Sequence, residues 1–111
     1  MKTITPTLIQ LEQELTRENL HELNQINPDK GSIAFDLSNT RTVDTHGLAT
    51  LLRIKKQLSK HGFDVVLINP KPSIRTLLYA TKLNTVLHSF TNLSSANLYF
   101  LRHYSDNTSG A

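Results

Sequence analysis

The sequence predicts one α/β domain built on a mainly parallel sheet of four to five strands with about four helices. The chain has 111 residues, which is the usual size of a single domain. Two short apolar runs, residues 32–37 and 63–68, are typical of strands buried on both faces. Strand and helix patterns alternate along the chain, which is typical of right-handed crossover units around a parallel sheet. We expect the domain to span residues 1–104 and a flexible polar tail to follow at residues 105–111.

The first forty residues predict an edge strand, a helix and a central strand. Residues 7–12 alternate apolar and polar side chains imperfectly, as edge strands do. Thr16 is placed to cap a helix of roughly three turns with Leu20 and Leu23 on one face. We expect this helix to end at residues 27–31, because Pro28 disfavours helical geometry in Asn27 and Gly31 permits a turn. The apolar run 32–37 then predicts the central strand.

The rest of the chain predicts three more helices and two more strands. After a connector at residues 38–43, leucines recur on one helical face until Gly62, which predicts the longest helix at residues 48–61. The buried strand 63–68 ends at two prolines, and residues 73–83 predict the next helix. Residues 86–90 are expected to form a final strand, and Ser94-Ser95 to cap a last helix through residues 97–101.

The amino-acid composition indicates the cellular compartment in which the protein is expected. The chain has no cysteine, so disulfides and thiolate metal sites are excluded, as suits a reducing cytosol. No apolar run approaches the ~20 residues that span a bilayer, and the N-terminus lacks the apolar block of a signal peptide. We expect a cytoplasmic protein that reaches a membrane only indirectly, at the inner membrane through a partner.

Charge is unevenly distributed along the chain. Residues 1–40 carry a net charge of −3 and residues 41–111 carry +6. The basic residues alternate with leucines and form no continuous tract, so we expect no nucleic-acid partner. Arg53, Lys56 and Lys60 would form one stripe on the longest predicted helix. That stripe is either a solvated face or a contact for an acidic protein surface.

Catalytic and metal sites have little support in the sequence. None of the five histidines, at positions 21, 46, 61, 88 and 103, forms the i, i+4 pair or carboxylate cluster of a zinc site. No nucleophile triad and no glycine-rich phosphate loop is present. We therefore predict no catalytic residue, no metal and no cofactor.

The segment Asp44-Thr45-His46-Gly47 precedes the longest predicted helix and follows a strand. Loops at the carboxyl ends of parallel strands commonly carry function, and helix N-termini stabilise oxygen atoms and negative charge. Simple helix capping, with Gly47 relieving crowding, explains the same residue types. From spacing alone, the structural and functional interpretations both stay open.

An ordered set of motifs resembles a known family. Ile33-Ala34-Phe35-Asp36-Leu37-Ser38 is followed by Val43-Asp44-Thr45-His46-Gly47-Leu48-Ala49, then by Val65-Val66-Leu67-Ile68-Asn69-Pro70. This set resembles the STAS domain shared by sulfate transporters and anti-sigma factor antagonists, over residues 7–90. The resemblance implies a non-catalytic domain that binds a protein through the loop and the following helix.

Two branches of that family imply different partners. In antagonists the hydroxyl residue after the loop aspartate, here Thr45, is phosphorylated by an anti-sigma factor serine kinase, and the phosphate blocks binding. The chain departs from that pattern at His46, where a second small hydroxyl is common. The motif is more similar to the STAS subunit of Mla-type phospholipid-trafficking ABC transporters, which maintain outer-membrane lipid asymmetry and in which this loop binds the cytoplasmic ATPase subunit.

The candidate site residues follow from this resemblance. Thr45 is the expected partner-binding or phosphorylated residue, and Asp44, His46 and Gly47 shape the loop. Thr50 and Arg53 are the expected contacts on the helix, whereas Leu48, Leu51 and Leu52 are expected in the core.

Overall fold

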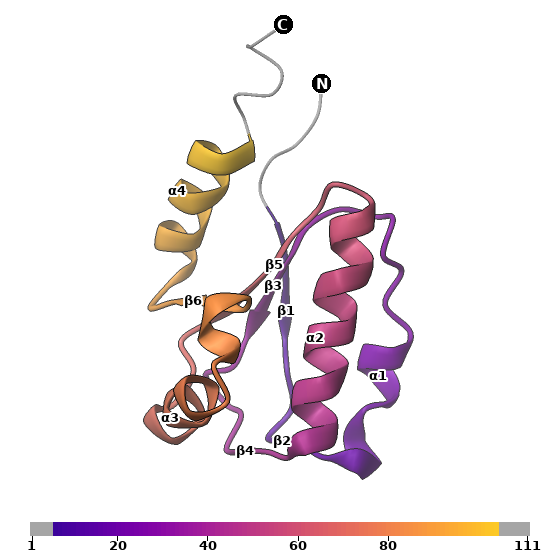
Figure 1. Ribbon diagram of the computed structural model, residues 1–111, viewed down its shortest axis with the longest axis vertical. Helices are drawn as coiled ribbons and strands as arrows, with labels where there is room; N and C mark the ends of the chain where they lie inside the picture. Colours follow the sequence, from indigo (N-terminus) through magenta and orange to yellow (C-terminus); the bar gives the residue numbers. More distant parts are fainter. Residues whose placement is uncertain (1–5, 105–111) are drawn as a thin grey trace, which may run out of the picture.

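The computed structural model describes residues 6–104, so the expected tail at residues 105–111 lies outside the described part of the chain. A parallel sheet forms the centre of the domain (Figure 1), with the strand order β1-β3-β5-β6. Its strands are β1 (Thr7–Gln10), β3 (Ile33–Asp36), β5 (Val65–Ile68) and β6 (His88–Phe90). Two very short strands, β2 (Glu14–Leu15) and β4 (Thr42–Val43), pair in parallel as a separate ladder. The predicted α/β class and mainly parallel sheet are confirmed.

Helices cover both faces of the sheet. The long helix α2 (Thr45–Lys60), the helix α3 (Pro72–Ala80) and the single turn α1 (His21–Asn24) pack on one face, and α4 (Leu93–Tyr104) packs on the other (Figure 1). Side chains alternate between the two faces, as the pleat of a strand requires. Phe35 and Leu67 belong to the core beneath α2 and α3, whereas Ala34 and Val66 contact α4.

The two apolar runs form the central strands, as predicted. Every residue of β5 is buried, and three of the four residues of β3 are buried. Each pairs on both sides, β3 with β1 and β5, and β5 with β3 and β6. The predicted position of β1 at an edge is also confirmed.

The helix expected after Thr16 is much shorter than predicted. A 3₁₀ helix (Arg17–Asn19) leads into the single α-helical turn of α1, and the Thr16 side chain makes no capping hydrogen bond. Leu20 and Leu23 are buried, so the apolar spacing identified the correct face. The chain before this segment is held by the pairing of β2 with β4. We infer that these tertiary contacts, rather than helix propensity, fix the length.

The boundaries of three other helices differ from the predictions. The longest helix begins at Thr45 rather than Leu48, because Asp44 caps it. Helix α3 ends at Ala80 rather than Leu83, since Lys82 adopts a left-handed conformation with φ of 62°. Helix α4 begins at Leu93 and is capped by Asn92, whose Oδ1 accepts from the Ser95 amide at 2.9 Å, instead of by Ser94-Ser95. No helix within residues 6–104 has the length and apolar character needed to cross a membrane.

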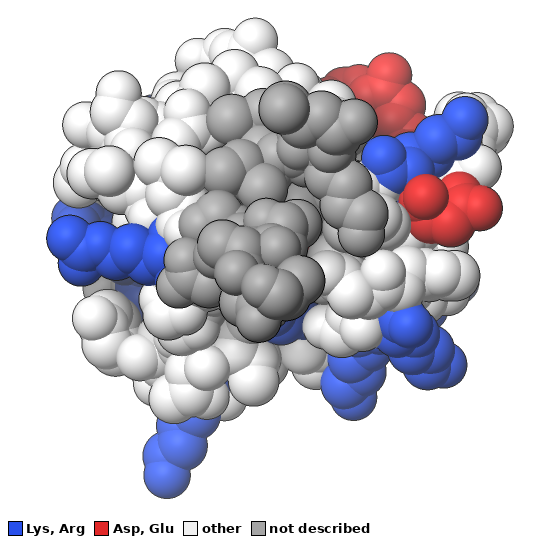
Figure 2. Space-filling view, turned by 90° about the horizontal axis from the view of Figure 1, so that it is seen from above, with Lys and Arg blue, Asp and Glu red and all other residues white. Residues whose placement is uncertain are grey.

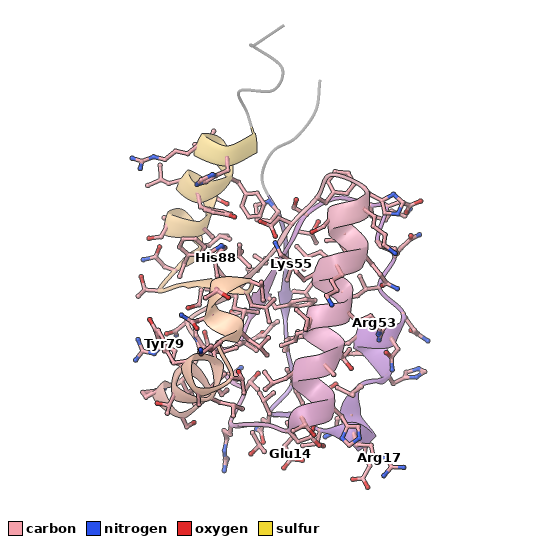
Figure 3. All side chains as sticks on the ribbon, viewed as in Figure 1. Glu14, Arg17, Arg53, Lys55, Tyr79 and His88 are labelled. Atoms are coloured by element: carbon pink, nitrogen blue, oxygen red, sulfur yellow. The ribbon has the colours of Figure 1, made fainter. Side chains whose placement is uncertain are left out.

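A buried polar cluster joins the two helical layers at the amino ends of the strands. The Asp64 side chain is 1% exposed and pairs with the Lys55 ammonium of α2. The Tyr99 hydroxyl of α4 donates to Asp64 Oδ2 at 2.8 Å. The Asp64 amide donates to Ser32 Oγ, just before β3. One carboxylate therefore links α2, α4 and the sheet, and Figure 3 shows Lys55 on the side of α2 opposite Arg53.

The buried ion pair predicts a specific loss of stability. Lys55→Met removes the charge that balances Asp64, and breaking one half of a buried pair is costly. Because Asp64 keeps the Tyr99 hydrogen bond, we expect a loss of about 2–3 kcal/mol in the free energy of unfolding, measured by urea denaturation. Lys56→Met is the matched control, since Lys56 is exposed, and we expect a change within about 0.5 kcal/mol. Equal losses in the two variants would contradict this role of Asp64.

Candidate functional site

The first turn of α2 lies at the carboxyl ends of the strands, at the lower end of the molecule in Figure 1. The chain reaches it from β3 through a short connector. Thr40, which is fully buried, anchors this connector by donating its hydroxyl to the Glu12 carbonyl at 2.8 Å. Strand β4 then pairs with β2 and leads directly into the helix. The predicted loop at residues 44–47 is therefore a cap followed by the first helical turn.

Asp44 ties this turn to a distant part of the chain. Its Oδ1 accepts from the Gly47 amide at 2.9 Å, which satisfies an N–H group that the helix itself cannot pair. Its Oδ2 accepts from the Arg17 amide at 3.1 Å, 27 residues earlier in the chain. The Asp44 amide donates to the Leu15 carbonyl at 3.2 Å. The capping interpretation is therefore correct, and the cap also fastens the segment that follows β2.

The same contacts keep the Asp44 carboxyl ionised. The hydrogen bond from the Gly47 amide is the main cause that lowers the pKa of Asp44 below 3.8. Partial loss of hydration acts in the opposite direction, and the Arg17 amide and the nearby His46 ring lower the pKa further. His46 Nδ1 lies 3.7 Å from Asp44 Oδ2, and its side chain is 57% exposed. At neutral pH this helix start therefore holds a fixed carboxylate.

Gly47 is required by the close approach of β2. A Cβ atom at this position would lie 2.2 Å from the Leu15 carbonyl oxygen, a distance that no side chain tolerates. Gly47 is buried, and the atom it meets belongs to the backbone. Gly47 was predicted to relieve crowding, and the element that would be crowded is the backbone of β2.

Thr45 occupies the first helical position and is exposed. Ala49 and Arg53 follow at intervals of four residues, so the three lie on one side of the helix, and both are exposed. We call these three residues together with His46 the candidate docking surface. Among residues 6–104, no side-chain hydrogen bond of Thr45 was found.

Thr50 does not belong to this surface, contrary to the expectation. It is only 7% exposed, and its hydroxyl donates to the His46 carbonyl at 2.8 Å, one turn earlier in the helix. The helical rotation places position 50 toward the sheet, beside Leu51 and Ile54 in the core. Leu48 and Leu51 are buried as expected, whereas Leu52 is only partly buried.

Arg53 is exposed but is held by a neighbouring element. Its Nη2 donates to Asn24 Oδ1 of α1 at 2.5 Å, and Figure 3 shows Arg53 on the α1 side of α2. The guanidinium therefore has a preferred position on the docking surface. Figure 2 views the opposite end of the molecule, where Lys and Arg side chains lie around the rim and some of them lie beside Asp or Glu.

Two residues that build the site were not predicted from the sequence. Leu15 and Arg17 both act through backbone atoms, which any residue type provides. No local pattern distinguishes them, since their role arises from the pairing of β2 with β4. Within the described range 6–104, no group of three or more His, Asp or Glu side chains could hold a metal ion.

Comparisons with known proteins agree with this architecture. A family model described as the STAS domain matches residues 6–96. No curated protein sequence matches the chain. The NMR structure of the protein TM1081 superposes with a TM-score of 0.74 at 23% identity and covers 86% of this chain and 81% of its own. A crystal structure of TM1081 from Thermotoga maritima names that protein a putative anti-sigma factor antagonist.

Two further solved structures share the fold at lower identity. An anti-sigma factor antagonist (STAS) domain protein from Planctomyces limnophilus has a TM-score of 0.70 at 15% identity, covering 88% of this chain and 92% of its own. The anti-sigma factor antagonist SpoIIAA in its unphosphorylated form has a TM-score of 0.65 at 15% identity, covering 93% and 94%. At these identities the similarity shows the fold alone.

Gly47→Ala tests the close approach of β2. Replacing a helical glycine by alanine ordinarily stabilises a helix by about 1 kcal/mol. Here the added methyl group meets the Leu15 carbonyl, so we expect a loss of about 1–3 kcal/mol in the free energy of unfolding by urea denaturation. Ala49→Gly, at an exposed position of the same helix, should cost only about 1 kcal/mol. A stabilised Gly47→Ala variant would contradict the packing of α2 against β2.

The lowered pKa of Asp44 predicts how its contribution depends on pH. A carboxyl whose pKa is depressed by folding stabilises the folded state above its unfolded pKa of 3.8, and this contribution is lost as the pH falls through the lower folded pKa. Asp44→Asn should keep one capping oxygen and lose the charge. We expect the wild type to have the higher urea midpoint at pH 7 and the difference to shrink below pH ~3.8. A difference that stays constant down to pH ~2 would refute this assignment.

Proposed function

The chain belongs to the STAS domain family, and from this premise we propose that it is a non-catalytic subunit that binds a protein partner through the docking surface at the start of α2. The observation that carries the proposal is the exposed Thr45 side chain at the start of a helix. The contacts of Asp44 and Gly47 with the β2 segment fix the position of that start. Asp44 and Gly47 are engaged with the fold, whereas Thr45, His46 and Ala49 face outward.

The rigidity of this surface supports a role in recognition. The first turn of α2 is joined to the β2 segment by the Asp44 carboxylate and by the Asp44 amide, so little ordering is needed when a partner binds. Ala49 presents only a methyl group, which lets a partner backbone approach closely. Arg53, held by Asn24, lies at the rim of the surface, where a charge favours an acidic partner.

We infer that the partner is the cytoplasmic ATPase subunit of an Mla-type phospholipid-trafficking ABC transporter. The support is the motif Asp44-Thr45-His46-Gly47-Leu48-Ala49 together with the exposed His46 ring, which takes the place of a second small hydroxyl. In this role the subunit is cytoplasmic and peripheral to the inner membrane, which it reaches only through the transporter. No cofactor and no nucleic acid is involved.

A second candidate is an anti-sigma factor antagonist controlled by phosphorylation of Thr45. Similarity in fold to three structures described as anti-sigma factor antagonists favours this candidate. A phosphate on Thr45 would add ~1.5 to 2 negative charges at a helix N-terminus, which accommodates them. The same charges would oppose removal of water from the surface and so block the binding of a partner. The partner would then be an anti-sigma factor serine kinase.

Thr45→Glu tests the docking surface. The acidic side chain is tolerated at the first turn of a helix, so the fold should persist. It places a charge at the centre of the proposed interface, so we expect the affinity for the ATPase subunit, measured by calorimetry, to fall at least ~100-fold. Thr76→Glu makes the same change at an exposed position of α3 and should leave binding intact. Full binding by Thr45→Glu would show that the interface lies elsewhere.

Phosphorylation of the wild type and of Thr45→Val distinguishes the two partner classes. Incubation with the serine kinase and ATP, followed by intact mass spectrometry, should add no phosphate if the partner is the ATPase subunit. Addition of one phosphate to the wild type and none to Thr45→Val would instead establish the antagonist function. Both candidate partners would bind the same docking surface. The partner class is therefore identified by which of the two, the ATPase subunit or the serine kinase, binds the wild type in calorimetry.

A further inference from the structure

A cleft of about 840 Å³ lies beside α3, apart from the docking surface. It opens at the β6 edge of the sheet, between α3 and α4, and residues 44–53 contribute nothing to its walls. Tyr79 and His88 both line the cleft, and Figure 3 shows them on the α3 side of the molecule. Arg17, whose amide donates to Asp44 at the start of α2, lies on the other side. Its volume is within the range of ~300–1,000 Å³ that is typical of small-molecule sites.

The charge of the cleft is positive. Lys71 and Arg75 both line it, and no aspartate or glutamate does. The two residues are four positions apart at the start of α3, so they project from the same side of the helix. In the part of the chain that the structure covers, neither cation has a carboxylate within 4 Å. Two cations therefore face the cleft without a counter-charge.

Hydrogen-bonding groups beside the cations are held in place by the fold. The Lys71 ammonium donates to the Ser38 carbonyl at 2.9 Å, which leaves two of its three protons for other acceptors. Asn69 Nδ2 donates to Ser38 Oγ at 3.2 Å, and the Asn69 amide donates to the Phe90 carbonyl at 2.6 Å. Asp36, near this point in the sequence, does not line the cleft and accepts from the Ser38 hydroxyl and amide.

Aromatic rings form the opposite wall. Phe90 and Tyr99 lie with their ring centroids 5.3 Å apart, and the Tyr99 hydroxyl is fixed by its bond to Asp64. Tyr79 is 68% exposed and also lines the cleft. The cleft thus combines two tilted aromatic rings with two cations.

We propose that this cleft binds a small phosphate monoester whose phosphate is attached to a flat, apolar group. A phosphate monoester carries up to two negative charges at neutral pH, which the Lys71 and Arg75 cations balance, and guanidinium and ammonium groups are the usual protein ligands of phosphate. The flat group would lie against the Phe90 and Tyr99 rings. The β6 strand has only three residues, and so short an edge offers little for an added peptide strand. The inference does not depend on the proposed docking function.

The test is a titration of the ¹⁵N-labelled full chain with phenyl phosphate, followed by NMR. We expect saturable shifts at the backbone amides of residues 69, 71, 73–75 and 88–91. Arg75→Gln and Lys71→Gln should each weaken the affinity at least ~10-fold. Lys60→Gln removes the same charge from the far end of α2 and should change the affinity less than ~2-fold. Inorganic phosphate should bind more weakly than phenyl phosphate, because it lacks the ring.

Several results would overturn the proposal. Benzyl alcohol, which has the ring without the charge, should cause no shifts at the same concentrations, and equal shifts would show a merely apolar cleft. Shifts concentrated at residues 44–60, or an Arg75→Gln variant with unchanged affinity, would exclude this site. Saturation by hexaglutamate at a lower concentration than by phenyl phosphate would identify an acidic-peptide groove instead.

Discussion

The arrangement of this molecule at its candidate site depends on one ionised carboxylate and one missing side chain. Asp44 accepts amide protons from Gly47 within α2 and from Arg17 beyond β2, so it joins the start of the longest helix to a segment 27 residues away. Gly47 allows the Leu15 carbonyl to approach to a distance that a Cβ atom would forbid. A change at either residue would weaken the packing of α2 against β2, which fixes the outward position of Thr45.

The two ends of the sheet serve different purposes. At the amino ends of the strands, Asp64 binds Lys55 and Tyr99 and thereby holds α2 and α4 on opposite faces. At the carboxyl ends, polar groups are exposed at the start of α2, while the cleft with its cations opens along the β6 edge beside α3. Parallel sheets commonly place their functional groups at the carboxyl ends. In this chain, fixed polar contacts lie at one end of the sheet, and the proposed docking surface and the proposed ligand cleft lie at the other.

Much of the fold could be predicted from the sequence, because its signals were local. The buried strands followed from two apolar runs, and a cap at Asp44 or Thr45 was one of the two interpretations of the segment ahead of the leucine-rich face. The short α1 could not be predicted, since the pairing of Glu14–Leu15 with Thr42–Val43 involves residues far apart in the chain. Thr50 was placed on the wrong face because the true helix start at Thr45 and the burial of position 50 depend on how α2 rotates against the sheet. Leu15 and Arg17 contribute backbone atoms, which no residue pattern reveals.

The most direct test of the central claim uses the absence of cysteine from the chain. Single cysteines at Thr45, Ala49 and Thr76, each carrying a benzophenone maleimide, can be irradiated in the presence of the proposed partner, the ATPase subunit. The account predicts that the partner is cross-linked from positions 45 and 49 and is not cross-linked from position 76 on α3. Cross-linking from position 76 with none from 45 or 49 would contradict it.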